Sequence, residues 1–316
     1  MAFVARAGTC RGIVQGAALF RHGGARSFVA LVPRENQEVQ RQEANRSLTT
    51  EPRKGVTSAP PATSLAESKW SDFSVEKWQS AVYTNRAYFG DLIADTSEFL
   101  VTIAEHVKLG GKRVSMVEVG CGTGEFVREV ADSFRTSVGL DFNPHFIEYC
   151  KDTCPPHQLG KSHFIQGDAT QLNDLLKEKF PTVPVLGSRG VEFWDDTRIV
   201  ACVGNTIGII PEEQRRQVYE QMAEVAGKDG VLVMVYWNAR WFGDACLNFY
   251  HANPQLCGPF DGASVDFAST TLTTPSKYKT HWTSVQEARA VMEELGMEII
   301  TLREKGKGVF VAARRF

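Results

Sequence analysis

The chain has 316 residues, of which 43% are hydrophobic and 23% charged, and its formal net charge is −2. This length allows one large α/β domain, or one domain plus an appendage. The charge lacks the basic excess of a nucleic-acid-binding surface, so we expect no nucleic-acid partner. No apolar run reaches the roughly 18 residues that span a bilayer, and no membrane partner is expected. The seven cysteines lack zinc-site spacing, so we expect no metal.

The N-terminal segment differs in composition from the rest of the chain. Residues 1–34 contain five arginines and no acidic residue, the first being Glu35. An arginine-rich, acid-free leader predicts a transit peptide for a mitochondrion or chloroplast, and an untargeted tail is the alternative. Polar, proline- and serine-containing sequence follows. We therefore predict a leader and disordered linker over residues 1–67 and one folded domain over 68–316.

The first half of the predicted domain alternates helical patterns with short apolar runs. The predicted helices span residues 78–89, 92–106, 125–134 and 144–151. The predicted strands span residues 113–119, 136–141 and 163–166. Strands that alternate with crossover helices indicate a parallel sheet.

The second half continues this alternation and then departs from it. Strands are predicted over residues 198–203 and 230–236, with an amphipathic helix over 211–226 between them. An aromatic-rich insertion of roughly 45 residues, 238–282, follows the fifth strand and is expected to act as a lid. A helix over 284–295 and a hairpin formed by 298–302 and 308–313 end the chain. The fold class is therefore α/β.

A glycine-rich loop follows the first predicted strand. Glu118, Gly120, Gly122 and Gly124 form a Glu-x-Gly-x-Gly-x-Gly pattern. Glycines in such a loop permit positive φ and close approach of a ligand to the backbone. The dinucleotide-binding pattern places its third glycine one position later. The loop resembles motif I of the class I methyltransferases, which implies S-adenosyl-L-methionine as cofactor and a Rossmann-like seven-stranded sheet preceded by N-terminal helices.

Two acidic residues follow the next two strands. Asp141 ends the second strand, 17 residues after Gly124, where a carboxylate can accept both ribose hydroxyls of a cofactor. Capping of the following helix is the alternative role for Asp141. Asp168 and Ala169 follow the third strand. The family resemblance implies that they contact the adenine ring, and a plain turn is the alternative.

The region after the fourth strand bears on the substrate. An Asn-Pro-Pro-Tyr-type motif, as found in nucleic-acid and protein-amide methyltransferases, is absent, and the segment contains Gly204 and Asn205 instead. This segment is similar to the Gly-Asn-Ser segment of small-molecule enzymes such as glycine N-methyltransferases. Asn205 is expected either to contact the cofactor or to hold the loop in place.

The predicted lid supplies the candidate catalytic residues. Aromatic rings stabilise cations, and methyl transfer from a sulfonium to a neutral nucleophile keeps a positive charge throughout, so Trp237, Trp241 and Tyr250 are candidates. Arg240 could hold a substrate carboxylate, and His251 could act as a general base. The alternative is ordinary packing for the rings and solvent exposure for the histidine.

Residues 202–211 and 235–260, with the Leu272–Pro275 segment and Trp282, resemble the algal methylthiohydroxybutyrate S-methyltransferases of dimethylsulfoniopropionate synthesis. The resemblance implies a small-molecule substrate, 4-methylthio-2-hydroxybutyrate, whose thioether sulfur needs no deprotonation. Three alternatives remain open. They are N-methylation of a small amine or amino acid, a non-catalytic methyltransferase-fold subunit and a nicotinamide-dependent oxidoreductase.

Overall fold

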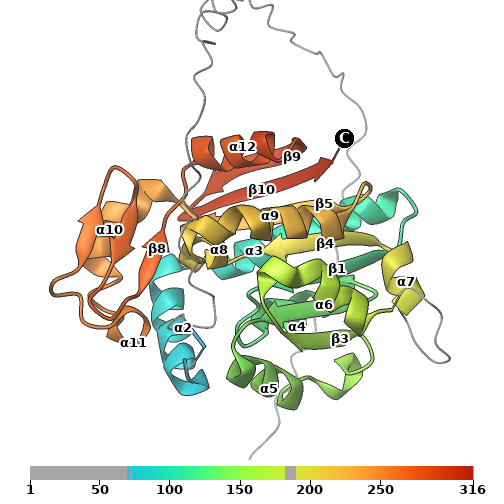
Figure 1. Ribbon diagram of the computed structural model, residues 1–316, viewed down its shortest axis with the longest axis horizontal. Coiled ribbons are helices and arrows are strands. Elements are labelled where there is room, and N and C mark those ends of the chain that lie inside the picture. The colour runs from blue at the N-terminus through green and yellow to red at the C-terminus, as the bar shows by residue number, and fades with distance from the viewer. Residues whose placement is uncertain (1–69, 72, 182–189, 316) are drawn as a thin grey trace, which may run out of the picture. The chain divides into compact units, whose positions relative to one another are not determined.

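The computed structural model describes residues 70–71, 73–181 and 190–315, and the predicted leader and linker over 1–67 lie outside them. The centre of the structure is a seven-stranded sheet with the strand order β3-β2-β1-β4-β5-β10-β9 (Figure 1). Its strands are β1 (Val114–Val119), β2 (Ser137–Asp141), β3 (Ser162–Gln166), β4 (Thr197–Cys202), β5 (Val231–Trp237), β9 (Met297–Lys305) and β10 (Gly308–Arg315). The first five are parallel, and β10 runs antiparallel to both β5 and β9. The predicted seven-stranded α/β fold is therefore confirmed.

Helices cover both faces of this sheet. One face packs against α2 (Val75–Phe89), α3 (Leu92–Leu109), α4 (Glu125–Val130) and α5 (Pro144–Asp152). The other face packs against α6 (Leu172–Lys179), α7 (Gly190–Asp195), α9 (Glu212–Ala226) and α12 (Val285–Glu294). Because both faces are covered, every residue of β1 and β5 is buried, as expected for parallel strands between two helical layers.

The boundaries differ from the prediction mainly where local capping decides them. α2 begins at Val75 because the Ser74 hydroxyl accepts a hydrogen bond from the Lys77 N–H, which is an N-cap. α4 ends at Val130, and a short 3₁₀ turn (Ala131–Ser133) completes the predicted helix. Helix α6 was not predicted; its buried Leu172 and Leu176 lie four residues apart, as on one face of a helix, but the segment is only 8 residues long.

The insertion after β5 folds into several short elements beside α2 (Figure 1). They are α10 (Phe242–Asn248), α11 (Pro254–Cys257) and a three-stranded antiparallel sheet of β6 (Ser264–Asp266), β7 (Thr271–Thr273) and β8 (Lys279–His281). The connection between β4 and β5 begins with α8 (Thr206–Ile209), which contacts β8 and precedes α9. The insertion therefore packs on both the N-terminal helix and the sheet, next to the carboxyl ends of β4 and β5. No helix among the described residues is long and apolar enough to cross a membrane.

Candidate active site

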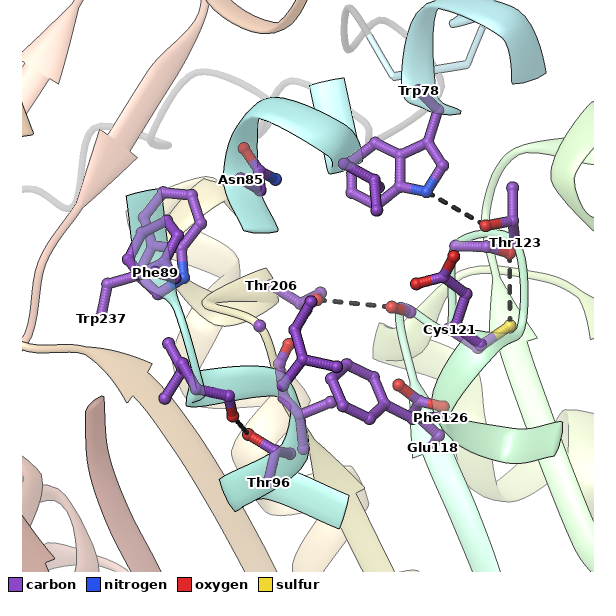
Figure 2. A pocket seen from close by; sticks show the side chains of 18 residues that line it. Trp78, Asn85, Phe89, Thr96, Glu118, Cys121, Thr123, Phe126, Thr206 and Trp237 are labelled. Atoms are coloured by element: carbon purple, nitrogen blue, oxygen red, sulfur yellow. Dashed lines mark hydrogen bonds between the residues drawn. The ribbon is translucent and has the colours of Figure 1, made fainter. Parts of the chain in front are cut away.

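Two adjoining cavities lie at the carboxyl ends of the parallel strands, which is where open α/β sheets bind ligands. The first, which we call the Glu118 cavity, lies between α2, α3, the glycine loop and the end of β5 (Figure 2). The second, the Asp141 cavity, lies between the ends of β1, β2 and β3 and helix α8. The two cavities share the lining residues Trp78, Gly120, Gly122 and Thr206. They therefore form one continuous binding region.

The three glycines of the loop all have positive φ, at 70°, 52° and 74°. A Cβ on Gly120 would lie 2.1 Å from the Thr206 methyl carbon, so this position tolerates no side chain without movement of the loop. A Cβ on Gly124 would meet Cys150 and Phe164 at 2.8 and 2.9 Å. Gly120 thus permits close packing against α8, and Gly124 permits close packing of α4 on the core.

The Asp141 carboxylate holds the loop in this shape. One of its oxygens accepts a hydrogen bond from the Gly122 N–H at 2.8 Å, and the other accepts from the Asn143 N–H at 2.9 Å. Burial raises the pKa of Asp141 to about 6, and backbone hydrogen bonds from Asn143, Gly122 and Phe142 act against this rise. The N-cap of α5 is Asn143, whose side chain accepts from His145 and Phe146. Asp141 lines the cavity instead of capping that helix.

Glu118 is the most buried charged group of the region. Its side chain ends in the first cavity, only 1% of the residue is exposed, and its Oε2 atom has no hydrogen-bond partner among the described residues. Burial, followed by the nearby Cys150 and Asp141, raises the pKa of Glu118 to about 8. A buried carboxylate oxygen without a hydrogen-bond partner lowers the stability of the fold unless a ligand donates to it. This atom therefore marks a position for a cationic donor.

The walls of the Asp141 cavity are largely apolar. Leu140, Phe142, Phe146, Ile209 and Ile210 form them, together with Trp70 and the backbone of Gly167. Ala169 lies in the lining, as the prediction requires for a residue near an adenine ring. Asp168 does not lie in the lining. Its Oδ1 accepts from the Thr170 N–H and hydroxyl, each at 2.8 Å, so it caps the short 3₁₀ helix that follows it.

Trp78 is a site residue that the sequence reasoning missed. Its ring lines both cavities, and its indole N–H donates to the Thr123 hydroxyl at 3.2 Å. A Cβ on Gly122 would lie 3.3 Å from this ring, so the tryptophan covers the glycine loop. The only sequence signal was an aromatic residue near the start of a predicted N-terminal helix, and nothing local indicates where that helix docks.

Of the five candidate catalytic residues, Trp237 alone lines either of the two cavities described above. Arg240 extends into solvent with its side chain 77% exposed, 4.0 Å from Glu304. Trp241 is 38% exposed and donates to the Gly306 carbonyl. The exposed His251 ring lies 4.2 Å from that of Phe260. The structure thus corrects the expectation that these side chains face the site.

Tyr250 and Asn205 hold the insertion together. Tyr250 is fully buried, and its hydroxyl accepts from the Trp282 indole N–H at 2.7 Å, which places it in the core and not in the cavity lining. Asn205 accepts from the Trp237 N–H at 3.1 Å and donates to the His281 carbonyl at 3.1 Å. Of the two predicted roles for Asn205, the structure shows the one that holds the loop, because the side chain bridges β5 and β8.

Residues 116–230 match the sequence model of a methyltransferase domain. This segment runs from β1 through the glycine loop, Asp141 and Asp168 to the residue before β5, so it contains the strand ends that bound the Asp141 cavity and the loop that both cavities share. This segment of the chain is a methyltransferase domain. No curated protein sequence matches it.

Solved structures of methyltransferases resemble the chain at low sequence identity. One is a magnesium protoporphyrin IX methyltransferase from Synechocystis PCC 6803 with bound S-adenosylhomocysteine, at 11% identity, covering 78% of this chain and 96% of the other, with a TM-score of 0.47. Another is an S-adenosylmethionine-dependent methyltransferase from Clostridium acetobutylicum, at 9% identity, covering 74% and 99%, also with a TM-score of 0.47.

The residues of the methyltransferase site fit its cofactor. The Glu118 oxygen without a partner suits the α-ammonium group, and the Asp141 carboxylate retains lone pairs for ribose hydroxyls after accepting from the loop. The apolar walls of the Asp141 cavity suit a flat purine ring. Bound S-adenosylmethionine supplies a sulfonium methyl group, and the shared lining between the two cavities is where this chain would hold it.

The buried Glu118 predicts a pH-dependent affinity. Its carboxyl group is half protonated near pH 8 in the free enzyme, and pairing with an ammonium favours the ionised form. We therefore expect S-adenosylhomocysteine to bind about tenfold more weakly per pH unit as the pH falls below 8, measured by titration calorimetry. Glu118→Gln should bind weakly and remove this slope. A slope that persisted in the variant would assign the titration to another group.

Proposed function

We propose that the enzyme transfers its methyl group to the thioether sulfur of a small molecule, and that 4-methylthio-2-hydroxybutyrate is this acceptor. The observation that carries the proposal is the aromatic wall of the Glu118 cavity. Trp78, Phe89, Phe126 and Trp237 line it, and the Phe89 and Trp237 rings stack with their centroids 4.6 Å apart (Figure 2). The resemblance of the insertion to algal S-methyltransferases names the specific acceptor.

Aromatic faces suit this reaction because the positive charge is never lost. The faces of aromatic rings stabilise a cation by about 0.5–2 kcal/mol each, most when water is excluded. Trp237 is 7% exposed and Phe89 is also 7% exposed, so their rings stand in a largely dry part of the cavity. A neutral sulfur acceptor gives a sulfonium product, whose charge such a wall stabilises.

The acidic and thiol side chains of the described lining are committed to other contacts. Glu118 is placed for the cofactor ammonium, and Glu125 pairs with Arg86 at 3.1 Å. The neighbouring Cys150 thiol and burial raise the pKa of Cys121 well above its usual range. A thioether keeps a free lone pair at every pH, so it needs none of these groups as a base.

The test is an acceptor panel with labelled S-adenosylmethionine. The purified full chain is incubated with 4-methylthio-2-hydroxybutyrate, 3-methylthiopropan-1-ol, 4-aminobutyrate and propylamine. We expect labelled sulfonium products from the thioethers, with kcat/KM independent of acceptor ionisation between pH 6.5 and 8.5 once cofactor is saturating. Product from the amines alone, rising with pH as each amine loses its proton, would overturn the thioether assignment and leave the methyltransferase assignment intact.

A further inference from the structure

We propose that the Asn85 side-chain amide and the Trp237 indole N–H form an anchoring subsite for a carboxylate of the methyl acceptor. Both residues line the Glu118 cavity, Asn85 from α2 and Trp237 from the end of β5. The subsite concerns the same acceptor as the proposed function. That the reacting atom is a thioether sulfur rests on the proposed function, whereas the anchor is argued from Asn85 and Trp237 alone. It identifies the acceptor class as a small carboxylic acid.

The orientation of Asn85 is set from outside the cavity. Its Oδ1 accepts a hydrogen bond from the Asn253 side-chain nitrogen at 2.9 Å, and Asn253 is fully buried in the insertion. Because the oxygen is held there, the Asn85 amide nitrogen turns toward the cavity (Figure 2). This nitrogen has no hydrogen-bond partner among the described residues. Its N–H groups are therefore free donors on the cavity wall.

Trp237 supplies the second donor on the same wall. Its ring stacks on Phe89, which lies one helical turn after Asn85 on α2, so the two donors are neighbours. Its backbone N–H is held by Asn205 at 3.1 Å, which fixes the residue at the end of the strand. Within the described part of the chain the indole N–H has no partner, and its nitrogen lies at the ring edge facing the cavity (Figure 2).

The charge distribution of the cavity selects what these donors bind. Glu118 lies on the opposite side of the cavity, so a carboxylate bound near it would be repelled (Figure 2). The indole N–H of Trp78 is already used by Thr123, and the Thr96 hydroxyl donates to the Leu92 carbonyl at 2.7 Å. Asn85 and Trp237 therefore offer the N–H groups to an acidic oxygen, which makes stronger hydrogen bonds than a neutral one.

The test uses two variants that remove one donor each and keep a side chain of the same kind at the position. Asn85→Asp keeps an oxygen for Asn253 and replaces the inward amide with a repelling carboxylate. Trp237→Phe keeps an aromatic ring against Phe89 and removes the N–H together with part of the indole ring. Gln79→Ala, on the exposed side of α2, is the matched control, since its amide contacts only the Tyr149 hydroxyl. KM and kcat are measured with each acid and its decarboxylated partner from the panel above.

We expect Asn85→Asp to raise KM about tenfold or more for 4-methylthio-2-hydroxybutyrate, as loss of a hydrogen bond to a charged group implies, and to change KM less than threefold for 3-methylthiopropan-1-ol. Trp237→Phe also alters the aromatic wall, so its expected result is a KM increase about tenfold larger for the acid than for the alcohol. Gln79→Ala should change neither value. If the amines alone are methylated, the same contrast between 4-aminobutyrate and propylamine tests the anchor separately from the thioether. Equal effects on acid and alcohol, or a KM increase in Arg240→Ala but not in Asn85→Asp, would overturn the subsite.

Discussion

Gly120→Ala is expected to weaken S-adenosylhomocysteine binding by about 100-fold and to reduce methyl transfer at least as much. The new Cβ would lie 2.1 Å from the Thr206 methyl carbon, and the residue has a φ of 70°. The loop or the Thr206 side chain must therefore shift, which costs about 1–3 kcal/mol for overpacking and about 1–2 kcal/mol for the left-handed backbone. Titration calorimetry on the folded variant measures the loss.

Two further variants separate the steric effect from the backbone effect. Gly111→Ala has a similar φ of 75° but places its Cβ in open space, so it should retain cofactor affinity and lose only a little thermal stability. Thr206→Ser removes the methyl group that the new Cβ meets. Combined with Gly120→Ala, it should recover about tenfold in affinity. Failure of this rescue, with Gly111→Ala as damaging as Gly120→Ala, would show that close packing on α8 is not what requires the glycine.

Asp141→Asn is expected to weaken cofactor binding by about 100-fold. The wild-type carboxylate accepts from Gly122 at 2.8 Å and from Asn143 at 2.9 Å, and an asparagine must turn an NH₂ group toward one of these donors. The substitution also removes an acceptor for the ribose hydroxyls, and each hydrogen bond to a charged group contributes about 1.5–3 kcal/mol. The measurements are the dissociation constant of S-adenosylhomocysteine and the KM for S-adenosylmethionine.

The control for this variant is Asp132→Asn. Asp132 is an exposed carboxylate that pairs with Lys161 on the surface and does not line either cavity. Its loss should leave the dissociation constant of S-adenosylhomocysteine within twofold of the wild-type value. Wild-type affinity should also fall as the pH drops below about 6, where Asp141 takes up a proton, and Asp141→Asn should lack that step. Full cofactor affinity in Asp141→Asn would show that the Asp141 carboxylate only holds the glycine loop in shape and does not bind the cofactor.

The cofactor region was predictable because its signals are local. Strand β1, the glycine loop and α4 follow one another within 17 residues, from Val114 to Val130, and the backbone requirements of that turn are visible as glycines. Asp141 ends the neighbouring parallel strand, so knowing that β1 and β2 pair suffices to place it at the same edge of the sheet. The hairpin of β9 and β10 was likewise visible from its strand pattern.

The Glu118 cavity was not predictable because packing between distant segments builds it. Composition identified the insertion as aromatic, yet the side on which each ring lies depends on how the insertion docks against α2. Trp237 faces the cavity, whereas Tyr250 is in the core and Trp241 is on the surface, although all three lie within 14 residues. A periodic pattern cannot assign these sides in a segment made of short helices and turns.

The sequence by itself thus determined the α/β fold, the methyl donor and the carboxylate at the end of β2, because each follows from backbone geometry within one strand–turn–helix unit and its neighbour. Only the tertiary structure decided that Trp78, Asn85 and Phe89 of α2 close the site, and that Arg240 and His251 lie outside it. The physical reason is that a helix's cavity-facing side is set by long-range burial against the glycine loop and β5. No residue pattern near α2 in the sequence predicts that α2 packs against the glycine loop and β5.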